Sequence, residues 1–163
     1  AEGGGVLLDL CHEIDLACMI CPSLALDGVK SIGHESFFGV DFASMLSLVS
    51  PNGATGTVSM DYLSPVLVRS GSLIGCTQNV AFDYVDNSAK VSSATGIKEY
   101  RFDLERNAMF MDIMRDFTIL AEESGGATLP DIPRMDRVRD SCTLIAKAWE
   151  QREFVGTVEV DLK

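Results

Sequence analysis

Basic side chains are scarce in this sequence of 163 residues, which has 13 Lys and Arg against 24 Asp and Glu and a formal net charge of -11. Binding to a nucleic-acid backbone or to an anionic membrane surface needs clustered Lys and Arg, so we exclude both partners. The longest apolar stretch, residues 6–22, is interrupted by charged side chains and falls short of the ~20 apolar residues that span a bilayer. A basic-then-apolar signal peptide is also lacking at the start.

A dinucleotide-binding fingerprint is absent as well. No G-x-G-x-x-G follows an expected strand, and no alternation of strand, helix and strand is visible. The glycine run at residues 3–5 precedes an expected helix without following a strand, so it is not that fingerprint. The chain starts at Ala1 without an initiator Met, and we interpret it as a fragment or a processed piece of a longer protein.

The cysteines number five, and most of them lie in apolar surroundings. An odd count disfavours a disulfide framework and favours a reduced, cytoplasmic setting. Cys18 and Cys21 have the spacing of a zinc knuckle or a redox pair, but a second such pair is missing. We therefore interpret them as small apolar filler at a helix end and expect no metal site.

What the sequence does contain is typical of one globular domain, 1–163, with 47% hydrophobic and 23% charged residues. Apolar periodicity and flanking Pro and Gly predict three helices and a run of strands. The helices are expected at 5–20, 107–123 and 133–151, and the strands at 28–36, 42–49, 54–62, 66–75, 79–85, 97–102 and 154–160, with a short strand at 89–91. Strands without intervening helices pair mainly antiparallel, which predicts an α+β domain with helices packed on one face of the sheet.

Four titratable side chains lie in the first predicted helix, whose apolar residues occur on all sides and predict a buried helix. They are Asp9, His12, Glu13 and Asp15. Buried carboxylates and imidazoles cost free energy unless they are partnered. Asp9–His12 or His12–Asp15 is therefore either a general base with its orienting carboxylate or a satisfied pair that pins the helix, and residue types alone favour the second. The second His of a metalloprotease H-E-x-x-H box is Leu16 here, which excludes that zinc site.

Three further polar side chains are candidates of weaker standing, and two of them have two interpretations. Arg69, in an expected strand, either holds an anionic or hydroxylated substrate or is a solubilising charge on an edge strand. Tyr62 either donates a hydrogen bond to a sugar or packs half-buried. We expect His34, between Gly33 and Glu35, to be a surface histidine.

Three segments together resemble a known family. The opening GGGVLLDLCHEIDLACMI resembles the start of the second domain in the glucose–fructose oxidoreductase / inositol dehydrogenase (Gfo/Idh/MocA) family. MDYLSPVLVRSGSLIG is similar to a strand pair of that family, and RNAMFMDIMRDF is similar to one of its helices. The segments occur in the family's order, and the resemblance covers nearly the whole chain. It implies a large, mostly antiparallel open sheet that supplies a substrate pocket and subunit contacts, as in the carboxy-terminal domain of these dehydrogenases.

The resemblance also implies a function. The missing amino-terminal half would be a Rossmann domain that binds NAD or NADP, and the substrate would be a sugar, cyclitol or sugar-nucleotide hydroxyl. His12 matches the catalytic acid–base histidine, and Asp15 matches the carboxylate that orients it. Asp9 lies three residues before His12, where many members place an aspartate four residues before it. Tyr62 and Arg69 match positions near the substrate pocket and the subunit interface.

An isolated piece of such an enzyme would be inactive, and the family's sheet would make it a homo-oligomer. Some members are sugar-sensing regulators without catalysis, so a non-catalytic sensing or oligomerisation module is the alternative. A regulator is expected to lose the acid–base group. The presence of His12 therefore favours the enzyme.

Overall fold

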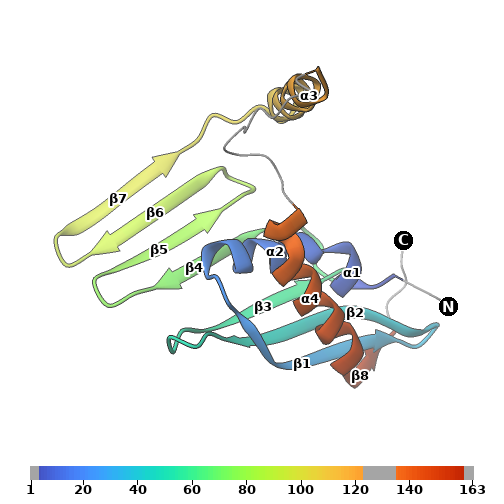
Figure 1. Ribbon diagram of the computed structural model, residues 1–163. Helices are drawn as coiled ribbons and strands as arrows, with labels where there is room; N and C mark the ends of the chain where they lie inside the picture. Colours follow the sequence, from blue (N-terminus) through green and yellow to red (C-terminus); the bar gives the residue numbers. More distant parts are fainter. Residues whose placement is uncertain (1–3, 123–134, 160–163) are drawn as a thin grey trace. The chain divides into compact units, whose positions relative to one another are not determined.

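The chain forms two compact units in the computed structural model, which describes residues 4–122 and 135–159. The first unit comprises Ala1–Leu63 and Pro133–Lys163, and the second comprises Ser64–Ile132. Figure 1 shows the helices and strands of both. Each unit has its own sheet of four strands.

The sheet of the first unit has the strand order β3-β2-β1-β8. Three strands are antiparallel neighbours, and the last strand of the chain pairs in parallel with β1. Their bounds are β1 Ala25–His34, β2 Phe37–Val49, β3 Thr55–Asp61 and β8 Glu153–Val158. The β2–β3 turn forms where Pro, Asn and Gly predicted it, with Gly53 at φ 87 and its N–H bonded to the Ser50 carbonyl at 2.9 Å.

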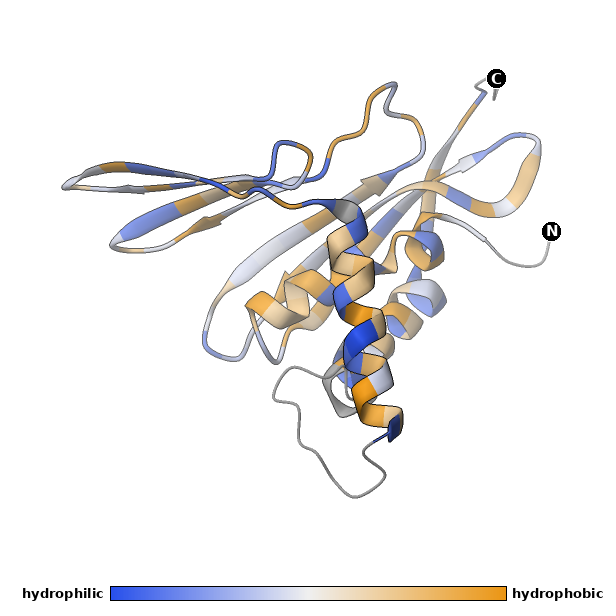
Figure 2. Ribbon diagram, turned by 90° about the horizontal axis from the view of Figure 1, so that it is seen from above, coloured by the Kyte–Doolittle hydropathy of each residue, from blue (hydrophilic) through white to orange (hydrophobic). Residues whose placement is uncertain are grey.

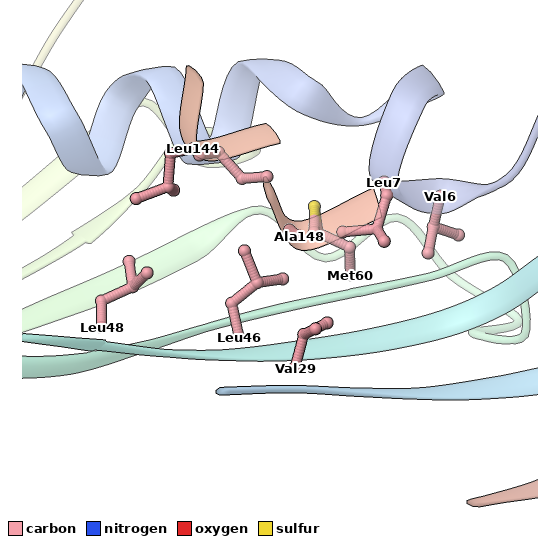
Figure 3. Close-up of a cluster of buried hydrophobic side chains, with 9 residues drawn as sticks. Val6, Leu7, Val29, Leu46, Leu48, Met60, Leu144 and Ala148 are labelled. Atoms are coloured by element: carbon pink, nitrogen blue, oxygen red, sulfur yellow. The ribbon is translucent and has the colours of Figure 1, made fainter. Parts of the chain in front are cut away.

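Helices cover one face of this sheet, as predicted. They are α1 Val6–Asp9, α2 Cys11–Ile20 and α4 Met135–Gln151. Figure 3 shows their apolar side chains meeting those of the strands. The resulting core consists of Val6, Leu7, Ile14, Val29, Leu46, Leu48, Met60, Leu144 and Ala148. Burying a Leu, Val or Ile side chain of this kind contributes about 1.5–3 kcal/mol, so this cluster fixes the helices on the sheet.

The first helix differs from its prediction in two ways. It is not continuous over 5–20, because the chain leaves helical geometry at Leu10, with φ -102 and ψ 26, between α1 and α2. It is also not buried on all sides: Ile14 is fully buried, whereas Met19 is 72% exposed and Leu8 is 39% exposed. The prediction of a wholly buried helix is therefore wrong for this chain, because only one side of α2 contacts the sheet and α4.

The second unit is an antiparallel meander with the strand order β4-β5-β6-β7, followed by a helix. Its elements are β4 Ser70–Ile74, β5 Gln78–Asp83, β6 Ser88–Ser93, β7 Gly96–Arg101 and α3 Arg106–Glu122. The short strand expected at 89–91 is a full member of this sheet. The turn after β5 forms as predicted: Asp83 Oδ1 accepts the N–H groups of Val85 at 2.7 Å and Asp86 at 3.1 Å.

Hydrophobic and hydrophilic residues are interspersed along the strands of the meander (Figure 2), and successive side chains of a strand point to opposite faces. Cross-strand neighbours share a face, so Phe82 and Tyr100 lie with Ala89 on one side. The α3 stripe that the sequence predicted is exposed, with Ile113 at 59% and Phe117 at 64%. The α+β class and the mostly antiparallel pairing are confirmed, with the strands divided between two sheets instead of forming one.

Candidate functional site

His12 lies in the first turn of α2, and half of its side chain is accessible to solvent. Its Nε2 is 3.1 Å from Oε1 of Glu13, whose side chain is only 23% exposed. In the described part of the chain, the carboxylate in contact with His12 is that of Glu13, and no contact with Asp9 or Asp15 is found. The ring is therefore not sealed in the core, and its nearest carboxylate is one that sequence reasoning did not select as its partner.

Asp9 is the last residue of α1 and is bonded to a distant residue. The Tyr62 hydroxyl donates a hydrogen bond to Asp9 Oδ2. Tyr62 follows directly after β3, its backbone N–H bonds to the Phe42 carbonyl at 2.9 Å, and its ring meets that of Phe42 edge-on at a centroid distance of 5.9 Å. The structure thus brings two predicted site residues together across 53 positions of sequence.

Burial raises the pKa of the Tyr62 hydroxyl above its usual value, and the hydrogen bond to Asp9 and the negative charges of Asp9 and Asp41 raise it further. The hydroxyl is therefore protonated at neutral pH, and its proton is committed to Asp9. A substrate at this position would meet the phenol oxygen as an acceptor, or the remaining oxygen of Asp9.

Asp15 points to α4. The Ser141 hydroxyl lies 2.5 Å from Asp15 Oδ1 and 3.0 Å from the Val138 carbonyl oxygen, and its single proton is shared between these acceptors. Ser141 is 2% exposed, so this contact ties α2 to α4 inside the first unit. The described contacts of Asp15 are those of an anchor between helices, and its orientation of His12 stays a prediction.

Arg69 belongs to the second unit, immediately before β4. The Arg69 guanidinium lies 5.0 Å from the centroid of the Tyr84 ring, and the Tyr84 N–H donates to the Arg69 carbonyl at 2.8 Å. A cation over an aromatic face contributes about 0.5–1 kcal/mol at exposed sites. These contacts hold the start of β4 against the turn after β5, and substrate binding by Arg69 stays a prediction.

His34 is buried, so the expectation of a surface histidine is wrong. Its Nδ1 accepts the Ser36 N–H at 3.0 Å, and its ring lies 4.7 Å from that of Phe42 and 5.1 Å from that of Phe37. The hairpin between β1 and β2 folds these aromatic rings over the imidazole. Local sequence did not reveal this, because the partners come from the following strand.

Asp41 is a further buried carboxylate that sequence reasoning missed. Its Oδ2 accepts the backbone N–H of Leu7 and the hydroxyl of Ser44, each at 3.0 Å, beneath the start of α1. The predicted strand began at residue 42, which left Asp41 just outside it. No sequence signal links Asp41 to Leu7, 34 positions away.

The five cysteines are free thiols, and no disulfide joins them in the described residues. Burial raises the pKa of the Cys18 thiol, and the nearby Asp15, Asp140 and Cys21 raise it further. A protonated thiol is a poor nucleophile and a poor metal ligand. Within the described ranges, no three His, Cys, Asp or Glu side chains gather as a metal would require, and none of the helices has the length and apolar character to cross a bilayer.

The chemistry available here is proton exchange at an accessible imidazole. A hollow of about 420 Å³ lies between α1, α2 and α4. It is lined by Leu8, Cys11, Cys142, Ile145, Ala146, Trp149 and Glu150, and so contains none of the predicted site residues. His12 and Asp9 are exposed residues of the first unit and lie outside this hollow.

No protein-family model and no curated protein sequence matches the chain. Solved structures do match its fold. A 3-ketoreductase from Actinomadura kijaniata, in complex with TDP-benzene and NADP, has a TM-score of 0.78 and 14% identity over 94% of this chain and 49% of its own. UDP-N-acetylglucosamine 3-dehydrogenase from Acidithiobacillus ferrooxidans has a TM-score of 0.69 and 12% identity over 91% of this chain and 47% of its own.

Levoglucosan dehydrogenase, in complex with NADH and levoglucosan, has a TM-score of 0.66 and 16% identity over 91% of this chain and 49% of its own. The chain spans about half the length of each of these three oxidoreductases. The chain therefore has the fold of part of these enzymes, which confirms at the level of fold the resemblance to the Gfo/Idh/MocA carboxy-terminal domain.

Proposed function

We propose that this chain is the substrate-binding, carboxy-terminal domain of an NAD(P)-dependent oxidoreductase that acts on a sugar, cyclitol or sugar-nucleotide hydroxyl. The observation that carries the proposal is the imidazole of His12, half exposed beside a carboxylate, in a fold similar to that of nicotinamide-dependent sugar enzymes. An accessible imidazole next to a carboxylate is suited to proton transfer near neutral pH.

In this proposal His12 takes the proton of the substrate hydroxyl during oxidation and returns it during reduction. Glu13, at 3.1 Å, stabilises the imidazolium that forms. The nicotinamide, when bound by an upstream domain, supplies the hydride acceptor. This chain contributes the proton carrier and the surface that orients the hydroxyl toward it.

Asp9 and Asp15 have different parts in this proposal. Asp9 keeps one carboxylate oxygen for a substrate hydroxyl while Tyr62 occupies the other. Asp15 fixes α2 against α4 through Ser141, which sets the direction of the helix that presents His12. Both carboxylates therefore act on the position of substrate or imidazole, and only His12 exchanges the proton.

The remaining expectations belong to the same proposal. Residues 1–163 form the substrate domain, and a Rossmann domain upstream binds NAD or NADP. The sheet surface brings copies together in a cytoplasmic homo-oligomer, in keeping with exposed apolar side chains such as Met45, 47% exposed on β2. Arg69 contacts the substrate or the neighbouring subunit.

The test uses the longer protein that the proposal requires. His12→Asn should lower turnover about 100-fold or more while NAD(P) binding stays unchanged, because the substitution removes the proton carrier without touching the cofactor domain. Asp27→Asn, at an exposed position of β1, is the control and should keep wild-type turnover. Unchanged turnover in His12→Asn would remove His12 from the mechanism.

The alternative is a non-catalytic sugar-sensing or oligomerisation module. The exposed apolar side chains of the second unit favour it, with Leu73 at 42% and Tyr100 at 37% exposure. Sedimentation of the chain tests this alternative. A strict monomer at micromolar concentration counts against an oligomerisation module.

A further inference from the structure

A carboxylate buried beneath α1 takes no part in the proposed chemistry. Asp41, on β2, is fully buried. Its Oδ2 accepts two hydrogen bonds, from Leu7 N–H and from the Ser44 hydroxyl, whereas its Oδ1 is buried with no hydrogen-bond partner among the residues that the structure describes. A buried polar atom without a partner costs free energy. A buried carboxylate at position 41 is therefore less stabilising than an apolar side chain would be, which indicates a role other than packing.

Gly5 is shaped around this carboxylate. Its φ is 136, a conformation that side chains other than glycine rarely adopt, and a Cβ built on it would lie 2.1 Å from Asp41 Oδ1. The Gly5 carbonyl accepts the N–H groups of Leu8 at 3.1 Å and Asp9 at 3.0 Å. Gly5 and Asp41 together thus bind the backbone donors at the start and the end of α1.

These contacts decide where α1 lies, because the helix is too short to be stable by itself. It has four residues, and nucleating one helical turn is unfavourable without outside contacts. Its last residue is Asp9, which receives the Tyr62 hydrogen bond, and α2 begins two residues later at Cys11. A shift of the first turn therefore moves Asp9 away from Tyr62 and moves the start of the helix that carries His12.

We propose that Asp41 is a positioning residue, which clamps the first turn of α1 and so places Asp9 against Tyr62 and His12 at the surface. Its importance for turnover rests on the proposed function. The clamp itself does not depend on the proposed function, and it is tested on this chain without any activity measurement.

The experiment is NMR on the full chain, with two signals. The first is the rate of hydrogen exchange at the Leu7 amide, whose N–H donates to Asp41. The second is the resonance of the Tyr62 hydroxyl proton, which is assigned by its disappearance in Tyr62→Phe. Asp41→Ala should speed Leu7 exchange about tenfold, the scale of a lost helix cap, and should abolish the Tyr62 hydroxyl signal. Asp41→Asn keeps an acceptor oxygen and should retain both signals.

Ser31→Ala is the matched control. Ser31 is fully buried, and its hydroxyl lies 2.8 Å from that of Ser44, which in turn donates to Asp41. Ser31 therefore belongs to the same hydrogen-bonded group as Asp41 but does not bond to α1. It should lower stability and leave the Tyr62 signal in place. If Asp41→Ala fails to fold, Gly5→Ala replaces it, because its Cβ would displace the carboxylate.

Loss of the Tyr62 signal in Asp41→Ala or Gly5→Ala, with retention in Ser31→Ala, supports the clamp. If Asp41→Ala, or Gly5→Ala in its place, keeps the Tyr62 signal and slow exchange at Leu7, the clamp is overturned. Failure of the His12→Asn test would overturn the enzyme proposal and leave this result unchanged, so the two failures are distinguishable.

Discussion

Removing the Tyr62 hydroxyl is the sharpest test of how the structure joins α1 to the sheet. Tyr62→Phe keeps the ring that packs on Phe42 and deletes only the donor to Asp9. A hydrogen bond to a charged acceptor contributes about 1.5–3 kcal/mol when it is buried. Because Tyr62 is 37% exposed and water can replace the hydroxyl at Asp9, we expect a loss of about 1 kcal/mol in the free energy of unfolding at pH 7.

The same bond predicts a dependence on pH. The folded-state pKa of Tyr62 is raised above its usual value of about 10, chiefly by burial, so the folded state holds this proton more tightly than the unfolded state does. The stabilisation is fully present below pH ~10 and is lost as the pH rises toward the folded-state pKa. The slope is at most about 1.4 kcal/mol per pH unit, and solvent screening at this exposed ring makes it smaller.

The assay is urea unfolding followed by the fluorescence of Trp149, the only tryptophan, which lies on α4 in the first unit. Wild type, Tyr62→Phe, Asp9→Asn and the double variant form a double-mutant cycle at pH 7 and at pH 10.5. A coupling energy near zero at pH 7, or an equal fall in stability with pH for wild type and Tyr62→Phe, would refute the hydrogen bond.

The other predictions concern packing and helix contacts. Leu46→Ala, at a fully buried position of β2, should cost about 2–5 kcal/mol in the same urea assay, and a loss below 1 kcal/mol would contradict the core described here. Ser141→Ala should cost about 1–3 kcal/mol because Asp15 loses its buried donor, whereas Thr143→Ala, whose hydroxyl bonds only within α4, should cost less than about 0.5 kcal/mol. Gly71→Ala should destabilise the second unit by about 1–3 kcal/mol, measured by amide exchange in β4 and β5, because its Cβ would lie 2.4 Å from Cζ of Phe82.

Local sequence patterns predicted most elements of this fold, because their signals are short-ranged. The alternation before Tyr62 and the Pro-Asn-Gly turn identified β3 and its connection to β2. The break at Leu10 was not predictable in the same way, since an apolar residue there fits a continuous helix. The turn before the break is bonded to Asp41 of β2, a contact that no local pattern shows. The division of strands between two sheets was equally invisible, because periodicity does not specify pairing partners.

The contacts made by the predicted site residues could not be read from the sequence. Sequence spacing placed Asp9 and Asp15 near His12, but spacing gives only the neighbours on one helix. Tyr62 and Ser141 are 53 and 126 positions from the carboxylates that they bind, and only the folded chain brings them there. The contact between Glu13 and His12 is not expected from spacing, because adjacent residues of a helix do not face each other, yet their side chains meet at 3.1 Å.

The polar run of the first helix therefore consists of three contacts with different partners. Asp9 is held by the residue that follows β3, Asp15 is held by α4, and Glu13 contacts His12. Apolar burial holds α2 on the sheet without fixing its rotation, because it has no preferred direction. The Ser141–Asp15 hydrogen bond joins α2 to α4 and is directional, so it restricts the rotation of α2. The Tyr62–Asp9 hydrogen bond acts in the same way on α1. Both contacts therefore restrain the backbone on either side of His12, whose own side chain stays half exposed.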